Sequence, residues 1–257
     1  MKPLIALILL VLSCSTSAQS VPTMAQIPVS LSTPQYAPLG EIIHFELSVQ
    51  DAPAALAKLL EYKGISATQV NPQTLAIAMG KQPQFSGNRQ AQHRQSSFVI
   101  DIDEAPTQAF IDGFKPSQLA SLQAIPAYVN EYINEPTYIH GFNFASVVAA
   151  QRSGDCTEYA VLTTALARAL GLDARLILGT VIMDESSQIG AFGHAWTEVW
   201  YQGKWQLIDA ALYTTDINTR YYLPSSSLEN EGPGFGLAIM MATKGFPSAI
   251  TQLHSLP

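Results

Sequence analysis

The first regular pattern along the chain is an alternation of apolar and polar residues over positions 41–49. Apolar side chains stand at every second position there, at Ile43, Phe45, Leu47 and Val49. A period of two places these side chains on one face, so the pattern predicts a half-buried β-strand.

A helix is predicted directly after this strand, ending near residue 62. Asp51 suits the N-cap, Pro53 fits the first turn and Gly64 suits the stop. Residues 74–79 predict a second strand. Together these elements predict a small N-terminal β-α-β module over residues 19–80.

The polar stretch 81–97, rich in Gln, Asn, Arg and Ser, predicts a linker. A larger domain would then occupy residues 98–257, with a strand over 98–102 and helices over 106–114 and 116–134.

The clearest helix of the chain follows Asp155. Asp155 and Glu158 have the spacing of a capping box, which places Cys156 in the first turn, and Gly171 suits the end. Because residues 159–170 are almost all Ala, Leu, Val and Thr, we expect this helix to be enclosed in the core.

Three β segments are predicted next, over residues 174–183, 194–201 and 204–210, with a loop over 184–193. A two-residue turn at Gln202 and Gly203 would join the last two segments as a hairpin. In that register His194 and Asp209 share a face as diagonal neighbours, whereas a three-residue loop would separate them.

Composition limits the possible functions. The chain of 257 residues is 47% hydrophobic and 13% charged, which is typical of a folded protein with a sizeable core. Its net charge of −7 and its scattered basic residues argue against a nucleic-acid partner, which requires clustered Lys and Arg.

The N-terminus has the form of a bacterial export signal, with Lys2, a short apolar run over 4–12 and small residues over 13–20. We favour a signal peptide over 1–18, cleaved after Ala18, and a periplasmic or secreted protein. The alternative interprets residues 11–14 as a lipobox, in which case a lipidated Cys14 would tether an envelope lipoprotein to the membrane.

On either interpretation Cys156 is the one thiol left for chemistry, without a cysteine partner for a disulfide. It is either a small buried apolar residue or a nucleophile. A helix N-terminus favours a thiolate and can supply amides to an oxyanion, whereas Asp155 opposes the charge. A proton-accepting partner is therefore needed. His194 is the candidate, with Asp209 fixing its tautomer.

Several motifs then resemble the transglutaminase-like superfamily, in the order Cys, His, Asp. They are residues 154–160, 168–175 and 193–200, followed by Trp205 and by Ile208 with Asp209. The resemblance implies an α+β, papain-like fold in which the helix of Cys156 packs on an antiparallel sheet. It also implies a catalytic triad of Cys156, His194 and Asp209.

The resemblance further implies a cysteine protease, amidase or acyltransferase that forms a thioester on Cys156. We expect hydrolysis of a protein or peptide substrate rather than crosslinking, and no metal or other cofactor. Some relatives use an upstream Trp in the oxyanion site, whereas every Trp here lies downstream, so Gln151 and Asn143 are weaker candidates for that role. The alternative function is a non-catalytic binding or scaffold module in the cell envelope.

Overall fold

A computed structural model describes residues 25–115, 121–137, 142–214, 216, 219–228 and 232–255. The predicted signal peptide, Cys14 and the start of the predicted helix 116–134 lie outside these residues. Among the described residues, no helix is long and apolar enough to cross a membrane.

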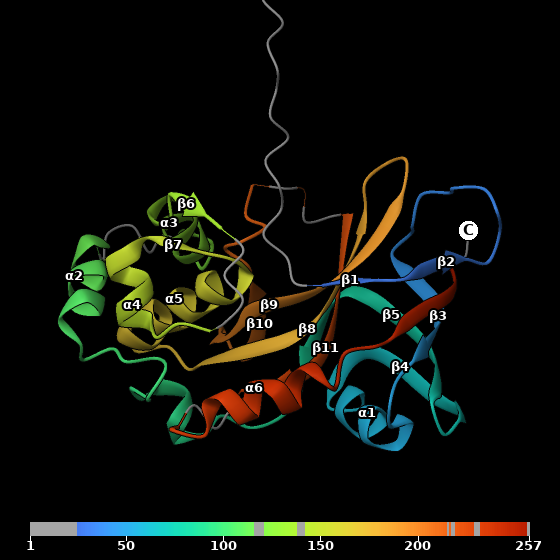
Figure 1. The fold of residues 1–257 in the computed structure, drawn as a ribbon, viewed down its shortest axis with the longest axis horizontal. Helices are drawn as coiled ribbons and strands as arrows, with labels where there is room; N and C mark the ends of the chain where they lie inside the picture. Colours follow the sequence, from blue (N-terminus) through green and yellow to red (C-terminus); the bar gives the residue numbers. More distant parts are fainter. Residues whose placement is uncertain are drawn as a thin grey trace, which may run out of the picture.

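Two five-stranded sheets organise the described residues (Figure 1). Sheet A has the order β1-β9-β8-β11, with β10 also paired to β9, and sheet B has the order β2-β12-β3-β5-β4. The strands of sheet A are β1 (Gln26–Ile27), β8 (Ala174–Asp184), β9 (Ile189–Tyr201), β10 (Lys204–Ile208) and β11 (Arg220–Ser227). Those of sheet B are β2 (Val29–Leu31), β3 (Ile42–Ser48), β4 (Tyr62–Asn71), β5 (Thr74–Phe85) and β12 (Ala249–Ser255). The short strands β6 (Glu135–Pro136) and β7 (Ser153–Gly154) pair separately.

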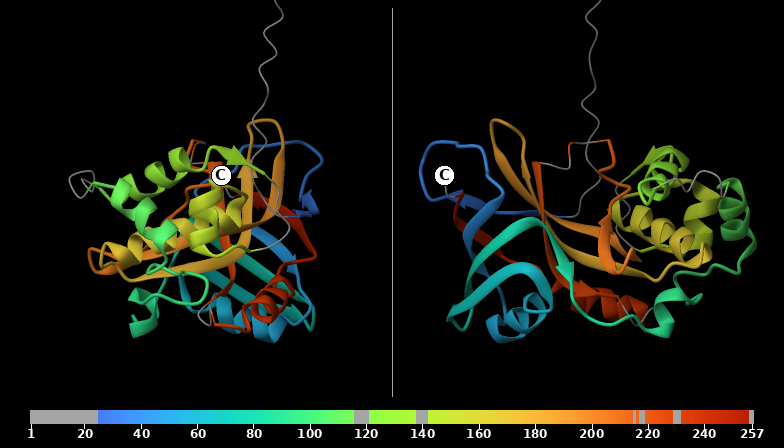
Figure 2. Two further views of the ribbon diagram at one scale, coloured as in Figure 1. Left: turned by 60° about the vertical axis from the view of Figure 1, so that its left-hand side comes forward. Right: turned by 180° about the vertical axis from the view of Figure 1, so that it is seen from behind.

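Helices lie at both ends of the molecule with sheet A between them, and α6 lies between the two ends along one side (Figures 1 and 2). The helices are α1 (Ala52–Leu59), α2 (Ala105–Gly113), α3 (Ala124–Tyr132), α4 (Ala145–Gln151), α5 (Cys156–Ala169) and α6 (Phe235–Thr243), with a 3₁₀ turn η1 (Ala91–Arg94). Helices α2 to α5 cluster at one end, and α1 lies against sheet B at the other. All strand pairs of sheet A are antiparallel, and α5 packs on this sheet, so the predicted α+β class is confirmed.

The N-terminal module contains the predicted strand as β3, the predicted helix as α1 and the predicted second strand within β5. The sequence pattern missed β4, an edge strand whose side chains are mostly exposed. Strand pairing crosses the proposed division of the chain. Strand β12 belongs to the predicted larger domain but pairs in sheet B with the strands of the N-terminal module, and β1 belongs to that module but pairs in sheet A. The division at residues 81–97 stays a prediction.

The predicted strand over 98–102 is wrong. Val99 and Ile100 are buried, but in a bend, where the Ile100 amide donates to Ser97 Oγ at 2.9 Å and the Ile102 amide to Ser96 Oγ at 3.1 Å. Serine hydroxyls satisfy these amides locally, so the segment is hydrogen-bonded without a strand partner.

The predicted loop over 184–193 is also wrong. Strands β8 and β9 remain paired as far as Asp184 and Ile189, so the connection is only residues 185–188. Gly190 lies inside β9, where a Cβ atom would stand 2.8 Å from the Phe192 ring. The glycine therefore provides room for a neighbouring aromatic ring in a strand rather than marking a loop.

Sheet A carries two hydrophobic cores on one face. Leu176, Leu178 and Val199 belong to the core around α5, whereas Ile182 and Leu223 belong to the core shared with sheet B. On the other face, Ile177, Val181 and Met183 of β8 pack in a third cluster. Because both faces of the sheet are covered, every residue of β8 is buried.

Candidate functional site

The start of α5 has the predicted geometry. Asp155 is its N-cap and accepts a hydrogen bond from the Thr157 amide at 3.0 Å, while Glu158 Oε2 accepts one from the Asp155 amide at 3.0 Å. The capping box is therefore confirmed, and Cys156 is the first residue of the helix. Gly154 is required here, because a Cβ atom would approach the Cβ of Glu158 to 2.2 Å.

The thiol of Cys156 is fully buried, with an exposed fraction of 0%. Burial, the charge of Asp155 and, more weakly, those of Asp209 and Glu158 hold the pKa of the Cys156 thiol well above its usual range. A hydrogen bond with the Ala195 backbone acts in the opposite direction on this pKa but does not outweigh burial. In this conformation burial and Asp155 outweigh any preference of the helix N-terminus for a thiolate, so the thiol still needs the proton-accepting partner that the sequence analysis calls for.

Glu158 is a second buried acid at this helix start. Its Oε1 accepts a hydrogen bond from the Asn143 amide at 3.1 Å, and its Oε2 accepts one from Thr157 Oγ1 at 2.9 Å. Burial and then the charge of Asp155 raise the pKa of Glu158 to about 8. The side chain therefore carries a proton over much of the neutral range.

The β9–β10 hairpin has the predicted even register. Gln202 and Gly203 form a two-residue turn with φ angles of 51° and 82°. Tyr201 pairs with Lys204, and Trp200 with Trp205. Positive φ at both central residues is the requirement of the turn that matches the twist of a hairpin.

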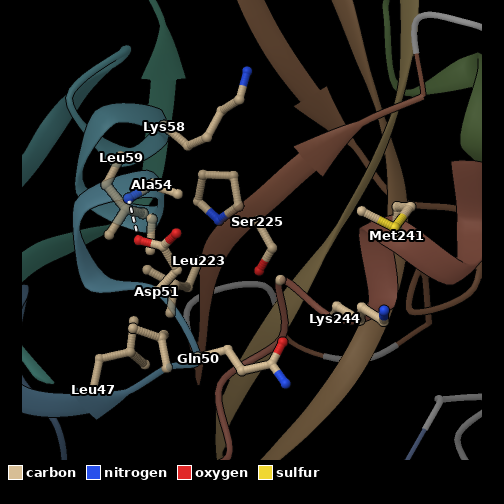
Figure 3. A pocket seen from close by; sticks show the side chains of 14 residues that line it. Leu47, Gln50, Asp51, Ala54, Lys58, Leu59, Leu223, Ser225, Met241 and Lys244 are labelled. Carbon is tan, nitrogen blue, oxygen red and sulfur yellow. Dashed lines mark hydrogen bonds between the residues drawn. The ribbon is translucent and has the colours of Figure 1, made fainter. Parts of the chain in front are cut away.

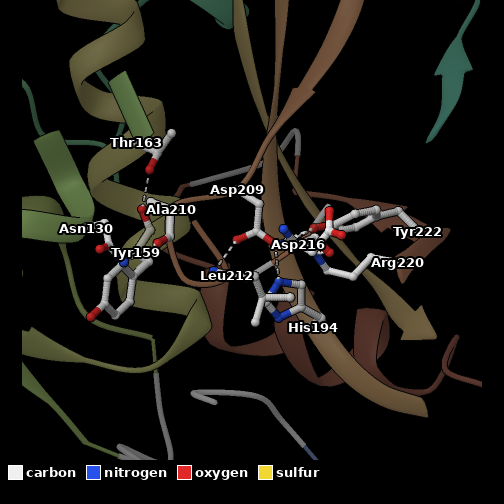
Figure 4. A network of polar contacts seen from close by, with 10 residues as sticks. All are labelled: Asn130, Tyr159, Thr163, His194, Asp209, Ala210, Leu212, Asp216, Arg220 and Tyr222. Atoms are coloured by element: carbon white, nitrogen blue, oxygen red, sulfur yellow. Dashed lines mark hydrogen bonds and ion pairs between the residues drawn. The ribbon is translucent and has the colours of Figure 1, made fainter. Parts of the chain in front are cut away.

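This register brings His194 and Asp209 into contact (Figure 4). His194 Nε2 lies 2.8 Å from Asp209 Oδ2, and both side chains are buried. The predicted pairing of these two residues is therefore present in the structure.

Two residues of β11 complete the surroundings of Asp209. The hydroxyl of Tyr222 donates to Asp209 Oδ2 at 2.8 Å, and Arg220 Nη1 donates to the same hydroxyl at 3.0 Å and lies 3.9 Å from Oδ2. The Leu212 amide donates to Asp209 Oδ1 at 3.2 Å. Burial opposes ionisation, yet the combined influence of His194, Tyr222 and Arg220 holds the pKa of Asp209 below its usual value.

An ionised Asp209 fixes the imidazole of His194. Because a carboxylate only accepts hydrogen bonds, His194 Nε2 carries the proton between the two groups, and in the neutral imidazole Nδ1 then carries the free lone pair. Nδ1 is buried and has no hydrogen-bond partner among the described residues. A buried nitrogen of this kind is available to accept a proton.

The thiol approaches this pair from the edge of β9. Thr197 Oγ1 donates to the Ala160 carbonyl at 3.1 Å, which places α5 on the face of β9 opposite to His194. On the outer edge of β9, the pairing with β1 stops at Phe192 and the pairing with β10 begins at Thr197. The Ala195 backbone, which interacts with the Cys156 thiol, lies in this gap. Cys156 thus lies beside the backbone that follows His194, without a hydrogen bond to the imidazole.

Among the described residues, neither of the two weaker candidates has a side-chain hydrogen bond with the Cys156 thiol or with His194. Asn143 is half-buried and lies beside the start of α5, where its backbone N–H donates a hydrogen bond to Glu158. Gln151 is exposed at the end of α4. Their proposed role at an oxyanion stays a prediction.

Sequence patterns did not indicate Tyr222 or Arg220. Each follows Asp209 by more than ten residues, and the described residues between β10 and β11 form no α-helix or strand, so no periodicity relates their positions. The one signal in the sequence is the alternation of Arg220 and Tyr222, two residues with polar groups, along one face of a strand. An ordinary strand with no functional role shows the same alternation. Among the described residues, no group of three or more His, Cys, Asp or Glu side chains could hold a metal ion.

A family model described as the Transglutaminase-like superfamily matches residues 107–210. This stretch runs from α2 to the residue after Asp209 and contains Cys156 and His194. The predicted resemblance to this superfamily is therefore confirmed.

The chain is also similar to solved structures. One is a candidate cysteine protease from Cytophaga hutchinsonii, with 15% identity, 75% of this chain and 78% of that chain covered, and a TM-score of 0.46. Another is the periplasmic domain of TgpA from Pseudomonas aeruginosa bound to ethylmercury, with 12% identity, 78% and 88% covered, and a TM-score of 0.43. No curated protein matches the chain. At these TM-scores the structural likenesses add nothing to the argument about activity.

Proposed function

We propose that this protein is an exported thiol-dependent acyl enzyme that acts on a peptide or glutamine-type amide. Cys156 is the nucleophile, His194 transfers the proton and Asp209 orients His194. Water is the favoured acceptor of the acyl group, which makes the enzyme a hydrolase rather than a crosslinker.

The observation that carries this proposal is the state of His194. Its Nε2 is bound to an ionised Asp209, and its Nδ1 has no partner among the described residues although it is buried. An unsatisfied buried nitrogen costs free energy, and a site for proton transfer gives it a role. Such an arrangement is the base and orienting group of a nucleophile-base-orienter triad.

The proposed reaction begins from a neutral thiol, because burial raises the pKa of Cys156. As Sγ attacks the amide carbonyl carbon, His194 Nδ1 accepts the thiol proton and the carbonyl oxygen becomes an oxyanion. The imidazolium is stabilised by Asp209. It then protonates the leaving amine as the C–N bond breaks and a thioester forms. Water, deprotonated by His194, attacks the thioester, and the carboxylic acid and the thiol are released.

One observation favours the second candidate, a non-catalytic binding or scaffold module. Cys156 and His194 each have an exposed fraction of 0%, so the site is closed to substrate in this conformation. A catalytic protein must open between α5 and β9 to admit a peptide, whereas a scaffold has no such need.

The two candidates are separated by incubating the protein with acetylated glutamine-containing peptides and a biotinylated primary amine. Mass spectrometry is expected to show either peptide fragments that together have gained one water or peptides in which Gln has become Glu with release of ammonia, with little biotin incorporated. The matched Cys156→Ala variant is expected to yield neither product.

Thiol labelling decides the case in which no peptide of the set is a substrate. If His194 accepts the thiol proton, iodoacetamide should modify the wild type faster at neutral pH than it modifies His194→Gln. Equal rates, together with no turnover by the wild type, would favour the scaffold.

Export is part of the same proposal. It is supported by the sequence of residues 1–20, with cleavage after Ala18 favoured over lipidation of Cys14. Mass spectrometry of the N-terminus after expression in a bacterium distinguishes the two, since a lipidated protein begins at Cys14 and carries acyl chains. A chain that retains Met1 in the cytoplasm would contradict both.

A further inference from the structure

A cavity of about 290 Å³ lies between α1 and the residues at the end of α6, away from the proposed site (Figure 3). Its walls are mainly aliphatic. They include Leu47 and Val49 near the end of β3, Ala54, Ala55 and Leu59 of α1, Leu223 of β11 and Met241 of α6. Helices α1 and α6 lie along the same side of the molecule in both views of Figure 2.

Apolar surface continues outside this cavity along α6. Leu237, Met240 and Met241 are all at least 49% exposed. Met241 lines the cavity and is also exposed, so a flexible apolar side chain stands at its mouth. A ligand with an aliphatic group would therefore be covered by Met241 as it enters.

A second cavity of about 460 Å³ shares Val49, Gln50 and Lys244 with the first. Its other lining residues are mostly hydroxyl and amide side chains, namely Ser48, Asn71, Gln73, Thr74 and Ser248, together with Phe246. The two cavities are therefore neighbours, and together they offer an aliphatic half and a hydrogen-bonding half.

Lys244 stands between the two halves and gives the site its charge. Lys58 pairs with Glu61 at 3.6 Å, and Asp51 caps α1 by accepting from the Ala54 amide at 3.0 Å. No hydrogen bond or ion pair of the Lys244 side chain occurs within the described part of the chain. A ligand carboxylate would supply the missing partner.

We propose that this site binds the C-terminal end of a peptide whose last residue is aliphatic. The terminal side chain occupies the aliphatic cavity, the terminal carboxylate pairs with Lys244, and the preceding peptide groups bond to the amide and hydroxyl side chains of the second cavity. A free fatty acid matches the aliphatic half and the charge, but it has no groups for the amide-lined half, so the peptide is the better match.

The test uses the whole chain in a Cys156→Ala background, so that binding is measured without turnover. The probe is an N-terminally fluorescent tetrapeptide of serine, glutamine, alanine and a final leucine, as the free acid and as the C-terminal amide. Fluorescence anisotropy is expected to show that the amide binds about tenfold more weakly, since it lacks the ion pair.

Variants locate the binding. Lys244→Gln should weaken the free acid about tenfold and leave the amide unchanged, and Lys204→Gln, an exposed lysine of the β9–β10 hairpin, should change neither. Ala54→Phe should block the aliphatic cavity and abolish binding. Ala57→Phe changes an exposed alanine of the same helix that does not line the cavity, so it should bind normally.

Three results would overturn the proposal. They are no binding of the acid peptide, equal loss in the Ala54→Phe and Ala57→Phe variants, or octanoate displacing the peptide as strongly as unlabelled peptide does. Melting temperatures of each variant exclude misfolding as the cause. Because binding is measured without Cys156, either outcome leaves the proposed thiol chemistry to its own test.

Discussion

The two sheets bury their side chains in different ways. In sheet B, the strand β3 alternates between buried and accessible residues, and no charged side chain is buried among residues 25–85. In sheet A, every residue of β8 is buried, and so are the charged or titratable side chains of Arg175, His194, Glu198 and Arg220. Buried charges are costly unless paired. The difference indicates that sheet B is built for stability, whereas sheet A accommodates polar chemistry at a cost in stability.

The largest expected effect tests the polar region. Asp209→Asn should reduce kcat/KM for peptide hydrolysis by a factor of about 10³ to 10⁴, because an amide can fix the wrong tautomer of His194. Activity on the peptide set described above measures this. Asp103→Asn, at an exposed position, is the matched control and should retain full activity. Full activity of Asp209→Asn would remove this residue from the site.

The next effect tests the apolar region. Phe45→Ala should lower the free energy of unfolding by about 3 to 5 kcal/mol, because Phe45 is 3% exposed within the core of sheet B. Urea denaturation measures the change. The kcat/KM of the folded fraction should stay within about twofold of the wild type. A large loss of kcat/KM without loss of stability would show that the two regions are coupled.

A smaller effect concerns pH. Folding raises the pKa of Glu158 from an ordinary value of 4.5 to about 8, so between these values the unfolded chain releases a proton that the folded chain keeps. The Glu158 contribution therefore lowers the free energy of unfolding as pH rises from 4.5 to about 8, and its full penalty persists above that range.

Glu158→Gln should remove this slope from the pH dependence of unfolding, measured by urea titrations at several pH values. Glu46→Gln, at an exposed position of β3, should keep the wild-type slope. If both variants keep it, Glu158 does not titrate in this range.

The smallest effect tests the hairpin that aligns His194 with Asp209. Gly203 has a φ angle of 82°, and a Cβ atom added to it would meet open space, so Gly203→Ala should cost about 1 kcal/mol through backbone conformation alone. Gly234 also has open space but a φ angle of −82°, so Gly234→Ala should be neutral or slightly stabilising. Thermal unfolding of the two variants compares them. Equal changes in Tm would mean that the positive φ angle at Gly203 carries no conformational cost for alanine and does not stabilise the β9–β10 register.

Local signals in the sequence determined the start of α5, the β9–β10 register and hence the pairing of His194 with Asp209. These features depend on residues a few positions apart, where capping, turn type and alternation act directly. The alternating pattern of β3 and the helix after Asp51 were predicted for the same reason.

Only the tertiary structure decided the rest. Tyr222 and Arg220 reach Asp209 across the sheet, and β12 joins sheet B although it is far from β3 in the sequence. The burial of Cys156 raises the pKa of its thiol and outweighs the preference of a helix N-terminus for the anion. Desolvation and long-range pairing depend on what surrounds a residue in space, and no spacing along the chain records that.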